Sequence, residues 1–214
     1  MWKKILENRF IILYVLPLSL GIFSVFSFQP FNLSFINILI LPILFLSIVY
    51  VRKSSMSIYR KKPYLINLFL IGYLFGIGFF LSGTYWISYS LSFDDSFKHL
   101  IPFTIIILPL FLGLFFGLGT IIVGPFLKNN LTSILFFCAS FAFIDYLRSK
   151  IFSGFPWNLW AYSWSWSTEI LQILNIFGLF AFNLLTITIF CLPLFVIIKK
   201  RYNLSIFFIL VFLF

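Results

Sequence analysis

The chain is a succession of long apolar stretches, and this pattern constrains its fold more than any other feature. A helix needs about 20 consecutive apolar residues to cross a bilayer. The composition agrees, since 62% of the 214 residues are hydrophobic and 9% are charged, compared with about 45–50% apolar residues in soluble domains. We therefore predict an all-α fold, a polytopic transmembrane helical bundle with six complete spans and a truncated seventh. The predicted spans are Phe10–Phe28, Phe35–Val51, Tyr64–Ile87, Leu100–Leu127, Leu131–Leu147, Ile170–Ile198 and Leu204–Phe214.

The first and last stretches need separate interpretation. Phe10–Phe28 follows Lys3, Lys4 and Arg9 and so resembles a signal peptide, but it is longer than the apolar region of one and no small-x-small cleavage site follows it. We expect an uncleaved helix, with a cleaved signal peptide as the alternative. Leu204–Phe214 has 11 residues, which cover about half of a 30 Å hydrocarbon core. This end predicts a fragment whose remainder would emerge on the periplasmic side.

The charged residues predict the orientation of the spans. A net charge of +10 could indicate nucleic-acid binding, but the basic residues fall in short clusters between apolar stretches, as the positive-inside rule requires. We expect no nucleic-acid partner and a cytoplasmic N-terminus. In this arrangement the basic residues on the outer side of the membrane are Lys98, Arg148 and Lys150. The acidic residues on that side are Asp94, Asp95, Asp145 and Glu169. The cytoplasmic basic residues are Lys3, Lys4, Arg9, Arg52, Lys53, Arg60, Lys61, Lys62, Lys128, Lys199, Lys200 and Arg201.

The two cysteines, Cys138 and Cys191, both lie inside predicted spans. This position excludes a solvent-exposed disulfide framework, and the spacing is not that of a metal site. We expect both to be small buried side chains, with no metal and no cofactor.

Small residues and prolines recur inside the spans. Glycines at helical spacing allow helices to approach closely, and prolines bend helices where neighbours satisfy the released carbonyl groups. Both features predict packing and bending. The residues are Gly72, Gly76, Gly83, Gly113 and Gly117, with Pro102, Pro109, Pro125 and Pro193.

The segment from Asp145 to Ser167, between the fifth and sixth spans, differs from every other loop. Arg148 breaks the orientation rule, and its spacing of three from Asp145 on one helical face predicts an ion pair. One interpretation is an interfacial aromatic girdle with snorkelling cations. The other is a lipid site in which Arg148 or Lys150 pairs with phosphate and an aromatic wall holds apolar chains. The aromatic residues are Phe152, Phe155, Trp157, Trp160, Tyr162, Trp164 and Trp166.

This segment also carries a family resemblance. Leu147-Arg148, then Gly154-Phe-Pro-Trp157, then Tyr162-Ser163 resemble the motif of apolipoprotein N-acyltransferases. The stretch from Gly76 to Trp86 is similar to the third transmembrane helix of that family. Phe28-Gln-Pro30 is similar to the turn after the first helix, and Gly178 to Asn183 to part of the sixth. The resemblance covers essentially the whole chain in the right order.

The resemblance implies a multi-pass enzyme of the bacterial inner membrane. Its expected partners are a phospholipid acyl donor, diacylated apolipoproteins and membrane lipids, because the family moves an acyl chain from a phospholipid to the amine of a lipoprotein's N-terminal diacylglyceryl-cysteine. The reaction passes through a thioester. Its nucleophilic Cys, with Glu and Lys partners, belongs to a periplasmic nitrilase-like domain that follows the seventh span. Residues 1–214 would therefore form the transmembrane N-terminal domain, inactive alone, with no catalytic residue among them.

The resemblance also implies which residues bind substrate. Arg148 and Trp157 match positions important for activity, and both are expected to serve the substrates and not the fold. Pro156 and Gly154 would shape the loop. Trp86 lies at the periplasmic end of the third span, and Tyr162 completes the expected substrate-binding set.

Two other functions remain open at this point. A transporter or channel would place ionisable residues inside spans or break helices at the midplane, whereas Asp145 lies at the end of a span and no other span interior holds a charge. A non-catalytic lipid-binding membrane protein is the second alternative.

Overall fold

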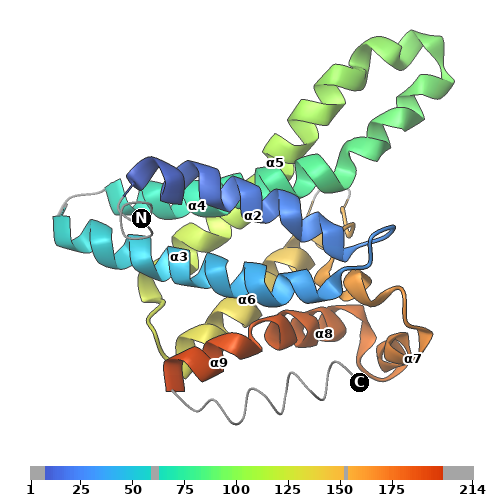
Figure 1. Cartoon of the computed structure of the whole chain (residues 1–214). Coiled ribbons are helices and arrows are strands. Elements are labelled where there is room, and N and C mark those ends of the chain that lie inside the picture. Colours follow the sequence, from blue (N-terminus) through green and yellow to red (C-terminus); the bar gives the residue numbers. More distant parts are fainter. Residues whose placement is uncertain (1–7, 59–62, 152–153, 200–214) are drawn as a thin grey trace. The chain divides into compact units, whose positions relative to one another are not determined.

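The computed structural model describes residues 8–58, 63–151 and 154–199, and helices are the only regular structure in those ranges. The chain divides into two compact units. The first comprises Met1–Val25 and Tyr50–Pro125, and the second comprises Phe26–Val49 and Phe126–Phe214. The predicted all-α class is confirmed, and Figure 1 shows the order of the helices along the chain.

Five helical segments within the described ranges are long and apolar enough to cross a membrane. The predicted count of six complete spans is not confirmed, because the first, Ile11–Ser27, is shorter than the 18 residues that define the other five. The predicted seventh span lies outside the described residues. The five segments are Ser34–Ser54, Tyr64–Phe93, Asp95–Phe126, Leu131–Lys150 and Ile173–Ile198.

The first unit contains a hairpin of two helices with a third helix beside it. Helix α4 packs along α5, and α2 packs on α4 (Figure 1). A Cβ atom at Gly76 would lie 2.8 Å from the Cα of Gly113, so glycine is what permits this α4–α5 contact. Gly72 and Gly117 face the same contact, as the sequence predicts. The elements are η1 (Ile11–Val15), α2 (Leu16–Ser24), α4 (Pro63–Thr84), η4 (Tyr85–Phe93), η5 (Asp95–Leu100) and α5 (Ile101–Val123).

Helical structure in this hairpin continues beyond the predicted spans. The third span was expected to end at Ile87 and the fourth to begin at Leu100, but 3₁₀ turns follow α4 as far as Phe93 and precede α5 from Asp95. The side chain of Asp94 caps the second of these turns by accepting from the Ser96 amide at 2.9 Å. Apolar content therefore underestimates the helical length, because both 3₁₀ segments carry polar residues.

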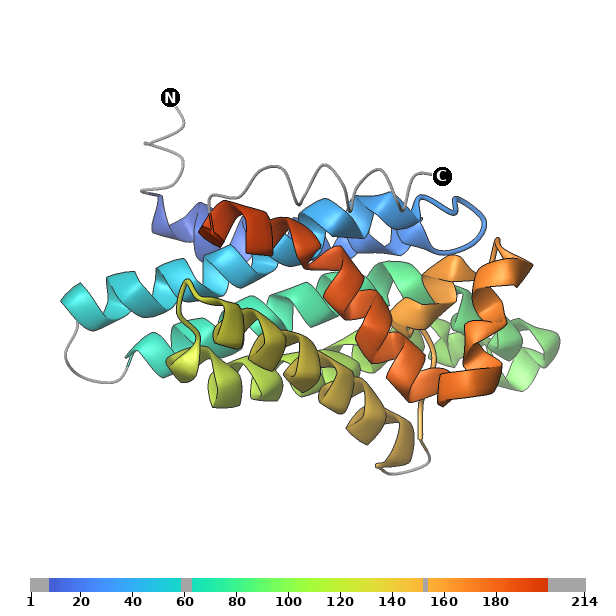
Figure 2. The same ribbon diagram turned by 90° about the horizontal axis from the view of Figure 1, so that it is seen from below.

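The second unit contains the segment that the sequence singles out. Helix α6 packs against α8 and α9. Figure 2 shows the bend between α8 and α9, at Cys191, and α8 has an internal kink at Gly178, where φ is 73°. The predicted sixth span is thus a bent segment. The elements are η3 (Ser34–Ile36), α3 (Asn37–Ile58, which begins in this unit), α6 (Leu131–Lys150), η7 (Trp160–Trp164), α7 (Thr168–Leu171), α8 (Ile173–Phe190) and α9 (Leu192–Lys199), while η2 (Val25–Ser27) and η6 (Gly124–Phe126) contain the unit boundaries.

Candidate functional site

The candidate site is the loop that leaves the C-terminal end of α6. The N-terminal end of this helix is capped by Asn130, whose side chain accepts from the Ser133 amide at 2.9 Å. After Lys150 the backbone becomes extended, and it turns at Gly154 with φ of 73°. A Cβ atom at Gly154 would meet the carbonyl of Ser149. Glycine therefore meets two requirements of this turn, the positive φ and the close approach.

Arg148, in the last turn of α6, holds the returning loop. Its side chain is buried and forms an ion pair with Asp145, with 3.0 Å between Nη2 and Oδ1. Nη1 donates to the carbonyl oxygen of Phe155 at 2.6 Å and to that of Trp157 at 2.7 Å. The predicted ion pair is confirmed. A guanidinium group suits this task because its fixed fork of donors reaches a carboxylate and two carbonyl groups together.

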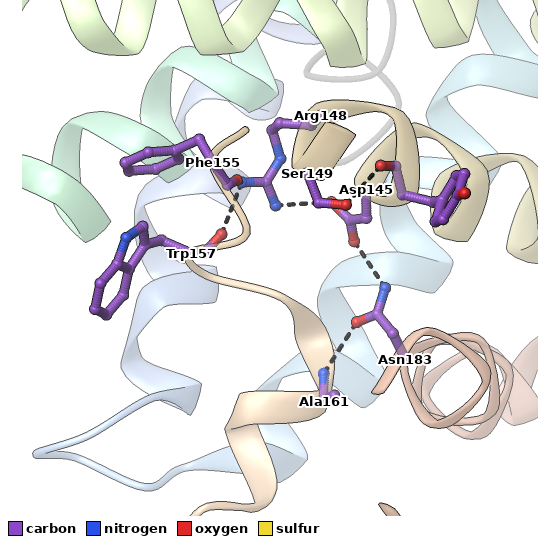
Figure 3. Close-up of polar contacts among 8 residues, drawn as sticks. Asp145, Arg148, Ser149, Phe155, Trp157, Ala161 and Asn183 are labelled. Carbon is purple, nitrogen blue, oxygen red and sulfur yellow. Dashed lines mark hydrogen bonds and ion pairs between the residues drawn. The ribbon is translucent and has the colours of Figure 1, made fainter. Parts of the chain in front are cut away.

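Asn183, on α8, completes this network from the opposite side. Its Nδ2 donates to Oδ2 of Asp145 at 2.9 Å, and its Oδ1 accepts from the backbone N–H of Ala161 at 3.0 Å. Asp145 therefore has one oxygen on Arg148 and the other on Asn183. Figure 3 shows these contacts, with the rings of Phe155 and Trp157 pointing away from the network. Hydrogen bonds to both carboxylate oxygens help to offset the cost of removing this charge pair from water.

The chain downstream of the loop is fixed by further hydrogen bonds. Nε1 of Trp164 donates to Thr186 on α8 at 3.1 Å, and Nε1 of Trp166 donates to Ser34 at 2.8 Å. The Ser34 hydroxyl in turn donates to the carbonyl oxygen of Ser163. The aromatic segment is thus an ordered part of the second unit, and an interfacial girdle alone would not require these specific bonds.

Three residues of this loop and of the turn that follows it present surface to the surroundings. Pro156 is exposed and Trp157 is 50% exposed. Tyr162 is half-buried; burial raises the pKa of its hydroxyl, and the positive charge of Arg148 offsets part of that rise. Tyr162 is therefore neutral at physiological pH and able to donate a hydrogen bond. A half-exposed indole and a neutral phenol are suited to contacts with apolar chains and polar headgroups.

The structure brings most of the predicted site residues together. Gly154, Pro156 and Trp157 lie on one loop of the second unit, Arg148 binds this loop from the last turn of α6, and Tyr162 follows in η7. Trp86 belongs to the first unit, where it is 45% exposed and its Nε1 donates to the carbonyl oxygen of Gly83 at 3.0 Å.

Substrate contact by the predicted residues stays a prediction, and the geometry distinguishes Arg148 from the others. The residue is 1% exposed, and its guanidinium group is hydrogen-bonded within the chain. Lys150, the other basic residue proposed to bind phosphate, is exposed, with Nζ 6.0 Å from the centre of the Tyr146 ring.

Sequence analysis missed the roles of Asn183 and Ser34. The resemblance included the stretch that ends at Asn183 but gave this residue no part in the site. The available signal was its polarity, because an amide buried in a mostly apolar span requires partners. Ser34 gave no such signal, since serine is common in turns.

The cysteines and the acidic residues limit the chemistry available in the described ranges. Cys138 and Cys191 are buried, as predicted, and a thiol in apolar surroundings is a poor nucleophile. No group of three or more His, Cys, Asp and Glu side chains there is placed to hold a metal ion.

Comparison with known proteins gives a consistent result. Residues 20–192 match the family model described as the apolipoprotein N-acyltransferase N-terminal domain. A protein of Rhodopseudomonas palustris named apolipoprotein N-acyltransferase is 30% identical over 181 residues, which cover 84% of this chain and 32% of the relative. One of the same name from Bradyrhizobium diazoefficiens is 31% identical over 193 residues, covering 90% of this chain and 33% of the relative.

A shorter alignment has higher identity. The apolipoprotein N-acyltransferase of Rickettsia bellii is 39% identical over 120 residues, covering 56% of this chain and 24% of the relative. In these alignments the chain spans about a quarter to a third of the length of the curated relatives.

Proposed function

Because the chain belongs to the apolipoprotein N-acyltransferase family, we propose that it is the membrane part of an enzyme that acylates lipoproteins. The acyl chain would come from a phospholipid, and the acceptor would be the N-terminal diacylglyceryl-cysteine of a diacylated apolipoprotein. The observation that carries this proposal is the family match over residues 20–192, which includes the whole network around Arg148.

The chain is a multi-pass membrane protein, with five segments suited to span a bilayer in the described ranges. We place it in the bacterial inner membrane with the N-terminus in the cytoplasm. The distribution of Lys and Arg supports this orientation, because cytoplasmic loops retain basic residues. In this orientation α6 ends on the periplasmic side, and the loop that contains Trp157 faces the outer leaflet, where lipoprotein substrates are anchored.

The loop would bind the lipid substrates through its exposed groups. The Trp157 indole offers an apolar surface to acyl chains, and Tyr162 offers a hydroxyl to a headgroup. Lys150, exposed at the end of α6, is the cation available to a phosphate group. Arg148 would act mainly by holding the backbone of Phe155 and Trp157 in place.

We assign binding and orientation to these 214 residues, and the acyl-transfer nucleophile to a part of the complete protein outside them. The burial of Cys138 and Cys191 supports this division, because acyl transfer through a thioester needs an accessible, activated thiolate. Residues 1–214 would thus form a membrane domain to which the nitrilase-like domain of the family is joined.

The test is conversion of a diacylated lipoprotein to its triacylated form. We expect the complete gene to support growth of a strain depleted of its own enzyme, and the purified 214-residue chain to insert into membranes without turnover. Turnover by that chain would contradict the assignment of the nucleophile. Failure of the complete gene at normal membrane abundance would favour a non-catalytic lipid-binding protein.

A further inference from the structure

Asn183 lies on α8, a mostly apolar helix, and uses both ends of its amide in hydrogen bonds. The side chain is completely buried. The amide nitrogen donates to Asp145 at 2.9 Å, and the amide oxygen accepts from the Ala161 N–H at 3.0 Å. These partners fix the orientation of the amide, because the reverse orientation would place a donor against a donor and an acceptor against an acceptor.

The two partners of Asn183 lie on different parts of the site. Asp145 forms the ion pair with the Arg148 guanidinium, and Arg148 donates to the loop carbonyl groups of Phe155 and Trp157. Ala161 is the second residue of η7, which follows the same loop. One network therefore holds the loop at its upstream end through Arg148 and at its downstream end through Asn183.

We propose that Asn183 is a positioning residue for substrate binding by the Trp157 loop. It acts by holding the Asp145 carboxylate in the position that directs Arg148, and by fixing the backbone at Ala161. The backbone of Trp157, bound by Arg148 and followed by the fixed Ala161, thereby holds the Trp157 ring in one orientation. This inference rests on the proposed function for the consequence in catalysis, but the placement of the loop is a property of the chain itself.

The position requires a side chain that donates on one side and accepts on the other. In Asn183→Asp, the new carboxylate faces the Asp145 carboxylate, and two carboxylates at this separation share one proton. With that proton bound, the pair reproduces the donor and acceptor pattern of the native amide. Without it, the two charges repel and the network opens.

A reciprocal exchange restores the pattern without a proton. In the double variant Asp145→Asn with Asn183→Asp, the new amide oxygen at position 145 accepts from Arg148 and the new amide nitrogen donates to the carboxylate at position 183. The other oxygen of that carboxylate accepts from Ala161. Every hydrogen bond of the native network has an equivalent, and the net charge is unchanged.

The charged groups bonded in this network, within the described residues, are Asp145 and Arg148 on α6. Tyr162 on η7 is the neighbouring titratable group that is influenced by Arg148. It is present in wild type and in every variant, so a change seen only in Asn183→Asp reports the new carboxylate.

The experiment compares these variants in the complete protein, purified in detergent. The first measurement is chymotrypsin cleavage after Trp157, mapped by mass spectrometry, which reports placement of the loop without requiring activity. The second is kcat/KM for conversion of a diacylated lipoprotein, measured from about pH 5.5 to about pH 8.5. This interval covers acidic and basic conditions on both sides of neutrality. Asn67→Ala is the matched control, since Asn67 is a buried, hydrogen-bonded asparagine of the first unit.

We expect Asn183→Ala to accelerate cleavage after Trp157 several-fold and to lower kcat/KM about tenfold or more, since it removes two buried hydrogen bonds, one of them to a charged group. Asn67→Ala should leave the cleavage rate unchanged. Asn183→Asp should have its highest activity relative to wild type at the lowest pH and lose it as pH rises. The reciprocal double variant should recover activity with the pH profile of wild type.

Native rates of cleavage and turnover in Asn183→Ala would overturn the proposal. So would a pH profile of Asn183→Asp that runs parallel to wild type, because a purely space-filling role does not depend on protonation. An inactive wild-type protein with accelerated cleavage in Asn183→Ala would refute the proposed function and leave the positioning of the loop supported.

Discussion

Replacing Arg148 and replacing Trp157 should have different consequences, although a hydrogen bond joins the two residues. Arg148→Ala removes the partner of the buried Asp145 and the donor to two backbone carbonyl groups. Removing one member of a buried ion pair costs about 3–5 kcal/mol, and each carbonyl left without a donor adds up to about 1–3 kcal/mol if it stays buried. The loop can loosen and let water reach the carbonyl groups, so we take the lower limit of about 3 kcal/mol.

Trp157→Ala should cost much less. The indole is 50% exposed, and the carbonyl group that accepts from Arg148 belongs to the backbone and remains. A loss of about 1 kcal/mol is expected, which is typical of a single substitution. Membrane abundance should therefore fall clearly for Arg148→Ala and stay near wild type for Trp157→Ala, while both variants lose lipoprotein acylation.

The assay measures membrane abundance, the thermal midpoint in detergent and acylation for the complete protein. Arg148→Lys is the informative control, because lysine keeps the charge for Asp145 but lacks the planar fork that reaches the carbonyl groups; it should lie between wild type and Arg148→Ala in stability. An Arg148→Ala protein with the abundance and midpoint of wild type would refute this reasoning. It would favour the expectation from sequence that Arg148 serves only the substrates.

Three further predictions follow from other parts of the chain. Gly76→Val should lower the thermal midpoint by an amount that corresponds to about 1–3 kcal/mol, because the new side chain would collide with Gly113 of α5; an unchanged midpoint would argue against this helix contact. A cysteine introduced at Ser165 should react with an impermeant thiol reagent on intact spheroplasts, and one at Ser55 should not; the opposite pattern would reverse the orientation. Asn130→Ala should cost about 1 kcal/mol of unfolding free energy through the lost cap of α6, measured by denaturant titration, and an effect near zero would mean that another group caps this helix.

The positions of most helices could be predicted from the sequence because the signal is local. Apolar stretches of about 20 residues locate the spans in the lipid environment without any knowledge of their neighbours. The pairing of Asp145 with Arg148 is local too, since a spacing of three places both side chains on one face of α6. Helix lengths were less predictable: Ile11–Ser27 is shorter than expected, and the hairpin near Asp94 has polar helical turns that hydrophobicity does not reveal.

The sequence by itself determined the all-helical membrane class and the segment around Arg148 as the candidate site. Only the tertiary structure decided that Asn183, 38 residues away from Asp145, completes this site, and that Ser34, 132 residues from Trp166, fixes the segment downstream. The physical reason is that a buried amide or hydroxyl must find a partner, but its sequence position does not specify which one. That choice depends on how α6, α8 and the turn before α3 pack together, and their packing is a property of the folded chain.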